Sequence, residues 1–144
     1  MREMVRVTRP GGTVAACMLD LRGGVVFGRM FWDTAAVLDS KAVDLRGKGF
    51  SWTITRQGGI AGELAAAGLE NVQETVLTIA LSFSDSEDFW ALLEGRDSGF
   101  AAYVSTLNVA QKDKFKCALR LAYFDGSPVG SRTYFASAWA ARGE

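Results

Sequence analysis

The stretch RVTRPGGTVAACMLD, residues 6–20, decides the fold class of this chain. The arginines ahead of Pro10 are typical of the last turn of a helix, because the helix dipole favours cations at that end. The turn PGG at residues 10–12 then ends the helix, since proline cannot continue it and glycine readily adopts a positive φ. The apolar run at residues 13–19 predicts a strand buried on both faces. Helix, turn and buried strand in this order predict an α/β domain.

The composition is that of a folded domain without an electrostatic preference. The chain has 144 residues, 49% of them hydrophobic, which is enough to bury a core. Its 16 basic and 16 acidic residues cancel, so there is no electrostatic basis for binding nucleic acid or an anionic membrane. No apolar run reaches the ~18 residues that cross a bilayer, and the first residues lack the apolar segment of a signal peptide. We therefore expect one cytoplasmic domain spanning residues 1–144.

The residue types that are missing exclude several kinds of chemistry. The chain has no histidine and two cysteines, Cys17 and Cys117. Without histidine there is no Ser-His or Cys-His nucleophile pair, and most zinc sites are also excluded. Two thiolates cannot form an all-cysteine zinc site within one chain. We expect both cysteines to be buried and reduced, and we assign no metal ligand.

Hydrophobic spacing predicts the remaining elements. Residues 71–83 carry the clearest strand pattern, and a short extended segment is expected at residues 50–55. A capping box at residues 84–87 and a second at residues 108–111 predict two helix starts. Helices are expected at residues 26–38, 60–67, 87–95, 100–107 and from 109 onward, with a final strand at 131–141. Lysines 112, 114 and 116 are interpreted as a solvated helix face.

Three passages, in this order, carry a family resemblance. EMVRVTRPGGTVAACMLD (3–20) is similar to a helix and fifth strand, and GELAAAGLENVQETVLTIALSF (62–83) to a helix, turn and sixth strand. SRTYFASAWAARG (131–143) is similar to a closing antiparallel strand that inserts between those two. Together they resemble the C-terminal half of a class I S-adenosylmethionine-dependent methyltransferase of the small-molecule and quinone-biosynthesis type. The N-terminal, cofactor-binding half of that domain has no counterpart here.

The resemblance implies a partial Rossmann-like fold. It implies a three-stranded mixed sheet in which the last strand is antiparallel and central, with helices around it. The aromatic-rich insertions at about residues 22–57 and 84–127 then match a helical cap over a substrate pocket. The implied activity is that of a transferase that methylates a small hydrophobic substrate with S-adenosylmethionine as cofactor.

Departures from the family pattern qualify that expectation. The glycine-rich cofactor loop, the acidic residue for the ribose and the flanking fourth-strand residues are absent, and the glycines at residues 58–62 lack dinucleotide-loop spacing. We therefore do not expect this chain alone to bind S-adenosylmethionine or to show appreciable methyltransferase activity. The resemblance predicts a truncated or split enzyme, with Met1 a candidate internal start.

Candidate site residues follow from the resemblance, and each has a structural alternative. Asp20 is the candidate for cofactor binding, because open α/β sheets bind ligands at the carboxyl ends of their strands; alternatively it caps the turn before Gly23. The candidates for a substrate pocket are Phe27, Met30, Phe31, Trp32, Trp90 and Tyr103. Their alternative role is core packing. Tyr103, Tyr123 and Tyr134 could act as phenolic acids or bases, but we assign no catalytic residue.

The strand at residues 13–19 also predicts a partner. Without the family's first strands it would lie at a sheet edge, where unpaired backbone groups favour strand pairing. We expect a homodimer that pairs these edges about a two-fold axis, and the alternative is a separate chain that supplies the front half. Two other functions remain open: a small α+β ligand-binding or isomerase-like dimeric domain without methyl transfer, and a structural dimer without a ligand.

Overall fold

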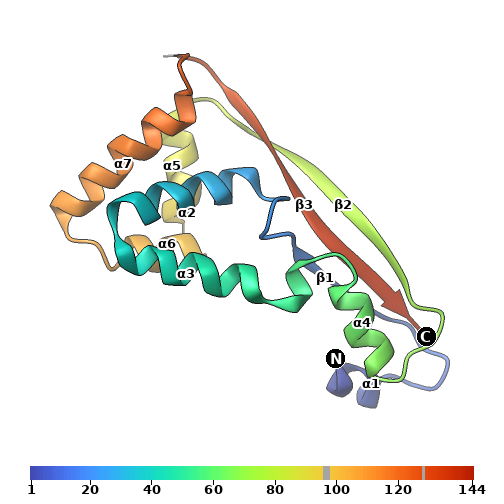
Figure 1. Ribbon diagram of the computed structural model, residues 1–144. Helices are drawn as coiled ribbons and strands as arrows, with labels where there is room; N and C mark the ends of the chain where they lie inside the picture. Colours follow the sequence, from blue (N-terminus) through green and yellow to red (C-terminus); the bar gives the residue numbers. More distant parts are fainter. Residues whose placement is uncertain (96–97, 128) are drawn as a thin grey trace. The chain divides into compact units, whose positions relative to one another are not determined.

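The computed structural model describes residues 1–95, 98–127 and 129–144 (Figure 1). Its elements are α1 (Arg2–Val7), β1 (Val14–Leu19), α2 (Val26–Leu38), α3 (Ser40–Ser51), the 3-10 helix η1 (Thr53–Thr55), α4 (Gly59–Ala66), β2 (Gln73–Phe83), α5 (Ser86–Glu94), α6 (Gly99–Val104), α7 (Val109–Phe124) and β3 (Arg132–Gly143). This is an α/β chain, as predicted.

The chain divides into two compact units. Unit 1 comprises Met1–Val25, Lys48–Ile79 and Phe135–Glu144, and unit 2 comprises Val26–Gly47 and Ala80–Tyr134. Unit 2 contains most of the two insertions for which the family resemblance implies a helical cap. The two units are described separately below.

Within the described residues, the three strands form one sheet in the order β1-β3-β2, so that the last strand is central, as predicted. β3 runs antiparallel to β1, from Val14 opposite Gly143 to Leu19 opposite Ala138. The side chains of Thr78 and Ser137 share a hydrogen bond of 2.9 Å between β2 and β3. Both neighbouring pairs are antiparallel, so the expected mixed sheet is wrong: β3 separates β1 from β2, and the described strands form no parallel pair.

The core of unit 1 lies on one face of this sheet. Val14 and Ala141 from the sheet pack with Ile60 and Leu64 from α4, and all four are buried. α4 begins after Gly58, whose φ of 76° favours glycine. The glycines at residues 58–62 therefore form a helix start, consistent with their lack of dinucleotide-loop spacing.

The opposite face of β1 is exposed, which corrects the expectation that this strand is buried on both faces. Side chains alternate along β1: Val14 is buried, whereas Ala15, Cys17 and Leu19 are exposed. A strand with one covered face requires alternate apolar residues only. Alanine and cysteine fit either environment, so the continuous apolar run did not distinguish the two cases.

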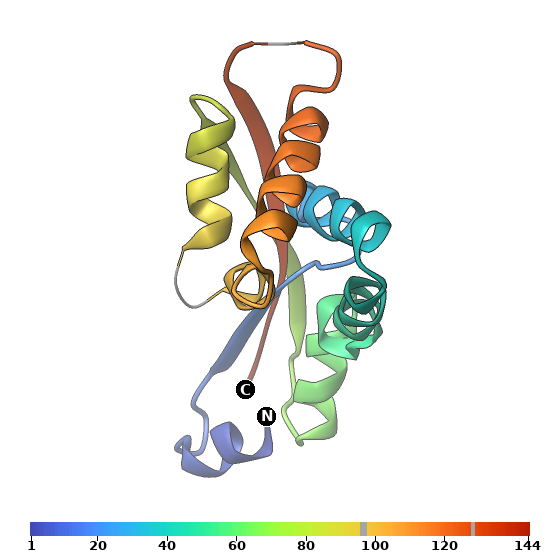
Figure 2. The same ribbon diagram turned by 90° about the vertical axis from the view of Figure 1, so that its left-hand side faces the viewer.

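The core of unit 2 is aromatic and helical. α2 packs on α7, while α6 and α7 contact α5 (Figure 2). Phe31, Phe89, Phe115 and Tyr123 are almost fully buried between these helices. The spacing of Phe115 and Leu119 turns one stripe of α7 inward, as predicted. Cys117 lies outside this stripe and is exposed, as is Cys17, so the expectation of buried cysteines is wrong for both.

Polar side chains fix the helix starts of unit 2. Asn108 and Gln111 form the predicted capping box of α7. α5 is capped by Asp85 rather than Ser84, because the Asp85 carboxylate accepts hydrogen bonds from the backbone N–H groups of both Glu87 and Asp88. Ser84 instead donates its backbone N–H to Asp88.

The segment after α2 differs from the prediction. Residues 50–55 are not extended: α3 continues to Ser51 and η1 follows. The carboxylate of Asp39 accepts a hydrogen bond of 3.0 Å from the backbone N–H of Lys41 and thereby caps α3. This helix has no clear pattern in the sequence, because it contains glycines at 47 and 49 and has only a weak apolar stripe.

Candidate functional site

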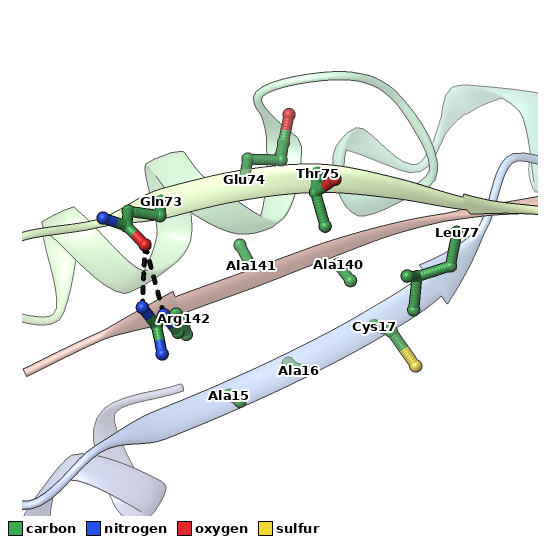
Figure 3. Close-up of a pocket in the computed structure, with 10 residues that line it drawn as sticks. All are labelled: Ala15, Ala16, Cys17, Gln73, Glu74, Thr75, Leu77, Ala140, Ala141 and Arg142. Carbon is green, nitrogen blue, oxygen red and sulfur yellow. Dashed lines mark hydrogen bonds between the residues drawn. The ribbon is translucent and has the colours of Figure 1, made fainter.

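A broad depression lies on the exposed sheet face of unit 1, and all three strands contribute to it. Its volume is about 870 Å³, and its lining includes Ala15, Cys17, Thr75, Leu77, Ala140 and Arg142. The register places Cys17 opposite Ala140 and Ala15 opposite Arg142, so small side chains form its floor except at Arg142. Figure 3 shows these side chains along the three neighbouring strands.

One end of the depression is polar. The guanidinium of Arg142 donates hydrogen bonds of 3.0 and 3.2 Å to Oε1 of Gln73 (Figure 3). The neutral amide orients the guanidinium without neutralising its charge. Glu74 also belongs to the lining, but one of its carboxylate oxygens accepts a hydrogen bond from Gly58 and the other is buried. The remaining lining is largely apolar, so the depression suits an apolar surface.

Two polar atoms in unit 1 are buried without a hydrogen-bond partner among the described residues: Oε2 of Glu74 and Nε1 of Trp139. The other carboxylate oxygen of Glu74 accepts a hydrogen bond of 2.7 Å from the backbone N–H of Gly58, ahead of α4. An unsatisfied buried polar atom costs about 1–3 kcal/mol. Nothing in the sequence pattern singles out either atom, because their burial depends on how β2 and β3 meet α4.

Asp20 lies at the carboxyl end of β1, where the sequence places it. Its Oδ1 accepts hydrogen bonds from the backbone N–H groups of Arg22, at 3.0 Å, and Gly23, at 3.2 Å. A Cβ at Gly24 would lie 2.6 Å from Cβ of Asp20, so this turn closes tightly around the carboxylate. The geometry is that of the turn-capping alternative, and the cofactor-binding role of Asp20 remains a prediction.

The structure brings most of the candidate substrate-pocket residues together inside unit 2. Phe31 has no exposed surface, and its ring centroid lies 4.8 Å from that of Phe100, 5.1 Å from Trp32 and 5.0 Å from Phe115. The other candidates are buried (Phe27, Trp90, Tyr103) or half-buried (Met30, Trp32). These contacts are those of a packed core, and a role in binding substrate remains a prediction.

The polar atoms of Trp90 and Tyr103 both form hydrogen bonds within unit 2. Nε1 of Trp90 donates a hydrogen bond of 2.8 Å to Glu94, which also pairs with Lys112. The hydroxyl of Tyr103 donates a hydrogen bond of 3.2 Å to Oδ2 of Asp39. Burial, together with the nearby Asp39 carboxylate, raises the pKa of the Tyr103 phenol to about 12.

The other two tyrosines are also poorly suited to act as bases. Burial raises the pKa of both Tyr123 and Tyr134 above the ordinary phenol value. The hydroxyl of Tyr123 donates a hydrogen bond of 3.4 Å to the backbone carbonyl of Phe83. All three phenols therefore stay protonated at neutral pH and can serve as hydrogen-bond donors.

The raised pKa of Tyr103 predicts a loss of stability at high pH. A phenol whose pKa is about 12 in the folded protein and about 10 in the unfolded chain binds its proton more tightly when folded. Its contribution to stability is therefore complete below pH ~10 and is lost as the pH rises to ~12, by about 2–3 kcal/mol. Urea unfolding across this range should show a steeper decline for the wild type than for Tyr103→Phe. Parallel pH profiles for the two proteins would contradict the assignment.

No protein-family model matches the sequence, and comparison with curated proteins finds no match. Across the described residues, no group of three or more histidine, cysteine, aspartate or glutamate side chains could hold a metal ion. In the same part of the chain, no helix is long and apolar enough to cross a membrane.

Proposed function

We propose that this chain is the back half of an S-adenosylmethionine-dependent methyltransferase domain that acts on a small molecule. The observation that carries the proposal is the sheet order β1-β3-β2, with the closing strand antiparallel and central. The family resemblance implies this order for the fifth, seventh and sixth strands of the domain. The aromatic helices of unit 2, which come from the two insertions, would then provide the substrate cap.

The kind of chemistry available is consistent with this role. Methyl transfer from a sulfonium donor depends mainly on holding the nucleophile and the methyl group in line, in a site closed to water. It does not require a strong base from this half of the domain. The protonated phenols and packed rings of unit 2 could orient an apolar acceptor by shape and by hydrogen-bond donation.

The exposed sheet face and the free edge of β1 support the need for a partner. The largely parallel sheet of a complete doubly wound α/β domain, of which these strands would form one end, carries helices on both faces. Here Leu19 is 46% exposed, and β1 lies at the end of the strand order. We propose that this edge pairs either with a front half that carries the cofactor loop or with a second copy of the chain. Asp20, at the end of the same strand, would then lie near the cofactor.

A second candidate is a small-molecule-binding domain without methyl transfer. It is favoured by the depression in unit 1, whose volume of about 870 Å³ falls within the range of ~300–1,000 Å³ typical of ligand sites. Its open position on a sheet face argues against it, since such sites usually enclose most of the ligand. Binding of an apolar ligand to the isolated chain, lost on Ala140→Trp, would favour this candidate.

Titration calorimetry with S-adenosylmethionine tests the leading proposal. We expect no binding by residues 1–144 alone, because the cofactor loop is missing. A chimera with the front half of a class I methyltransferase fused ahead of residue 1 should bind the cofactor and should protect the β1 amides from hydrogen exchange. Binding by the isolated chain, or a folded chimera in which β1 still exchanges freely, would contradict the proposal.

A further inference from the structure

We propose that the depression on the exposed sheet face of unit 1 binds an amphipathic carboxylate, that is, a small molecule with one carboxylate on an apolar body. The carboxylate pairs with Arg142, and the apolar body lies along the strands toward Leu77. The inference rests on the second candidate function above, a small-molecule-binding domain, and names its class of ligand. It does not depend on the methyltransferase proposal.

The guanidinium of Arg142 is held in an orientation that suits a carboxylate. Its Nε and Nη2 donate hydrogen bonds of 3.2 and 3.0 Å to the same oxygen of Gln73. The N–H groups at the other edge of this planar group, on Nη1 and Nη2, have no acceptor among the described residues. Figure 3 shows that edge pointing away from Gln73. Two parallel N–H groups match the two oxygens of a carboxylate, and such charge-assisted pairs are among the stronger hydrogen bonds.

The charge on the open face selects an anion as the occupant. Glu74 is also part of the lining, but alternation along β2 places its side chain on the other face from Gln73. There its Oε1 accepts a hydrogen bond of 2.7 Å from the backbone N–H of Gly58. A second copy paired face to face would present the same guanidinium and the same turned-away carboxylate, so it would leave Arg142 unmatched.

The rest of the depression fits an apolar chain. Cys17 and Ala140 lie opposite each other on β1 and β3, and their small side chains leave a shallow floor. Gln73 and Leu77 lie on the same face of β2, four residues apart, so the polar and apolar ends are separated by about 13 Å. Leu77 is 52% exposed and offers apolar surface that a ligand would cover. A medium-chain fatty acid combines this length with one terminal carboxylate.

Chemical-shift titrations of the isotope-labelled chain with octanoate and with 1-octanol test the proposal. We expect octanoate to bind more tightly, although the neutral alcohol is the more apolar molecule, and to shift the amide signals of Cys17, Ala140 and Arg142. Arg142→Gln should raise the dissociation constant of octanoate by about tenfold or more and leave that of 1-octanol unchanged. Arg9→Gln removes the same charge from an exposed residue outside the depression, and it should change neither constant.

Other results would overturn the inference. Equal affinities for octanoate and 1-octanol, or an Arg142→Gln protein that binds octanoate like the wild type, contradict it but leave an apolar ligand site in place. If neither molecule binds, the second candidate function is wrong as well. Should Arg142→Gln lose its circular dichroism spectrum, the comparison of the two ligands on the wild type decides.

Alkylation of Cys17 distinguishes a ligand from a second copy on the same face. Octanoate should slow the modification of Cys17, while the exposed thiol of Cys117 in unit 2 reacts at an unchanged rate. Slowing at Cys17 that increases with protein concentration in the absence of octanoate would assign the face to a second copy and overturn the inference.

Discussion

Replacing Phe31 with alanine is expected to destabilise the protein by about 3–5 kcal/mol. Phe31 is fully buried in unit 2, and its ring contacts those of Trp32, Phe100, Tyr103 and Phe115. Truncation removes the transfer free energy of the ring and leaves a cavity that rigid aromatic neighbours fill poorly. The measurement compares the free energies of unfolding of the wild type and Phe31→Ala, obtained from urea titrations monitored by circular dichroism.

This experiment also distinguishes the two roles considered for Phe31. Phe135→Ala is the matched control, because the ring of Phe135 is exposed and should contribute less than about 1 kcal/mol. A side chain lining an open substrate pocket would behave like the control. A loss below 1 kcal/mol for Phe31→Ala would therefore favour the pocket over the core.

Replacing Gly59 with alanine is expected to destabilise unit 1 by about 3 kcal/mol. A Cβ at this position would lie 2.0 Å from the carbonyl oxygen of Thr53 and 3.0 Å from Cα of Ile54. Both are backbone atoms, so a side-chain rotation cannot relieve the overlap. Either η1 or the start of α4 must move, which disturbs the packing of Ile60 against the sheet.

Gly62 provides the control within the same helix. An added Cβ at Gly62 meets no atom within 4 Å, and alanine is a better helix former than glycine. Gly62→Ala should therefore raise the free energy of unfolding by up to about 1 kcal/mol. Equal effects of the two substitutions, in either direction, would mean that η1 does not pack on α4 as described.

Sequence periodicity predicted the elements with strong local signals. The capping box at Asn108 was predicted and confirmed, because an N-cap depends on residues three apart. The central position of β3 was also confirmed, but it came from the family resemblance rather than from periodicity. α3 was not predicted, since its two glycines and weak apolar stripe resemble a loop.

The candidate site could not be predicted from local sequence patterns. The depression in unit 1 depends on Cys17, Thr75 and Ala140 lying side by side, although they are far apart in the sequence. Only the strand register brings them together, and register is set by long-range pairing. Conversely, most of the aromatic residues proposed for a pocket lie together in unit 2, but the pattern of an apolar helix cannot distinguish a cavity lining from a core.

The exposure of both cysteines gives this protein two natural reporter positions. The thiol of Cys17 lies on the bare side of the sheet in unit 1, and that of Cys117 lies on the outer stripe of α7 in unit 2. An alkylating reagent should therefore modify both in the free chain. Any molecule that covers the sheet will slow modification at Cys17, while Cys117 serves as an internal reference. Assembly can thus be followed residue by residue by mass spectrometry, without introducing a label.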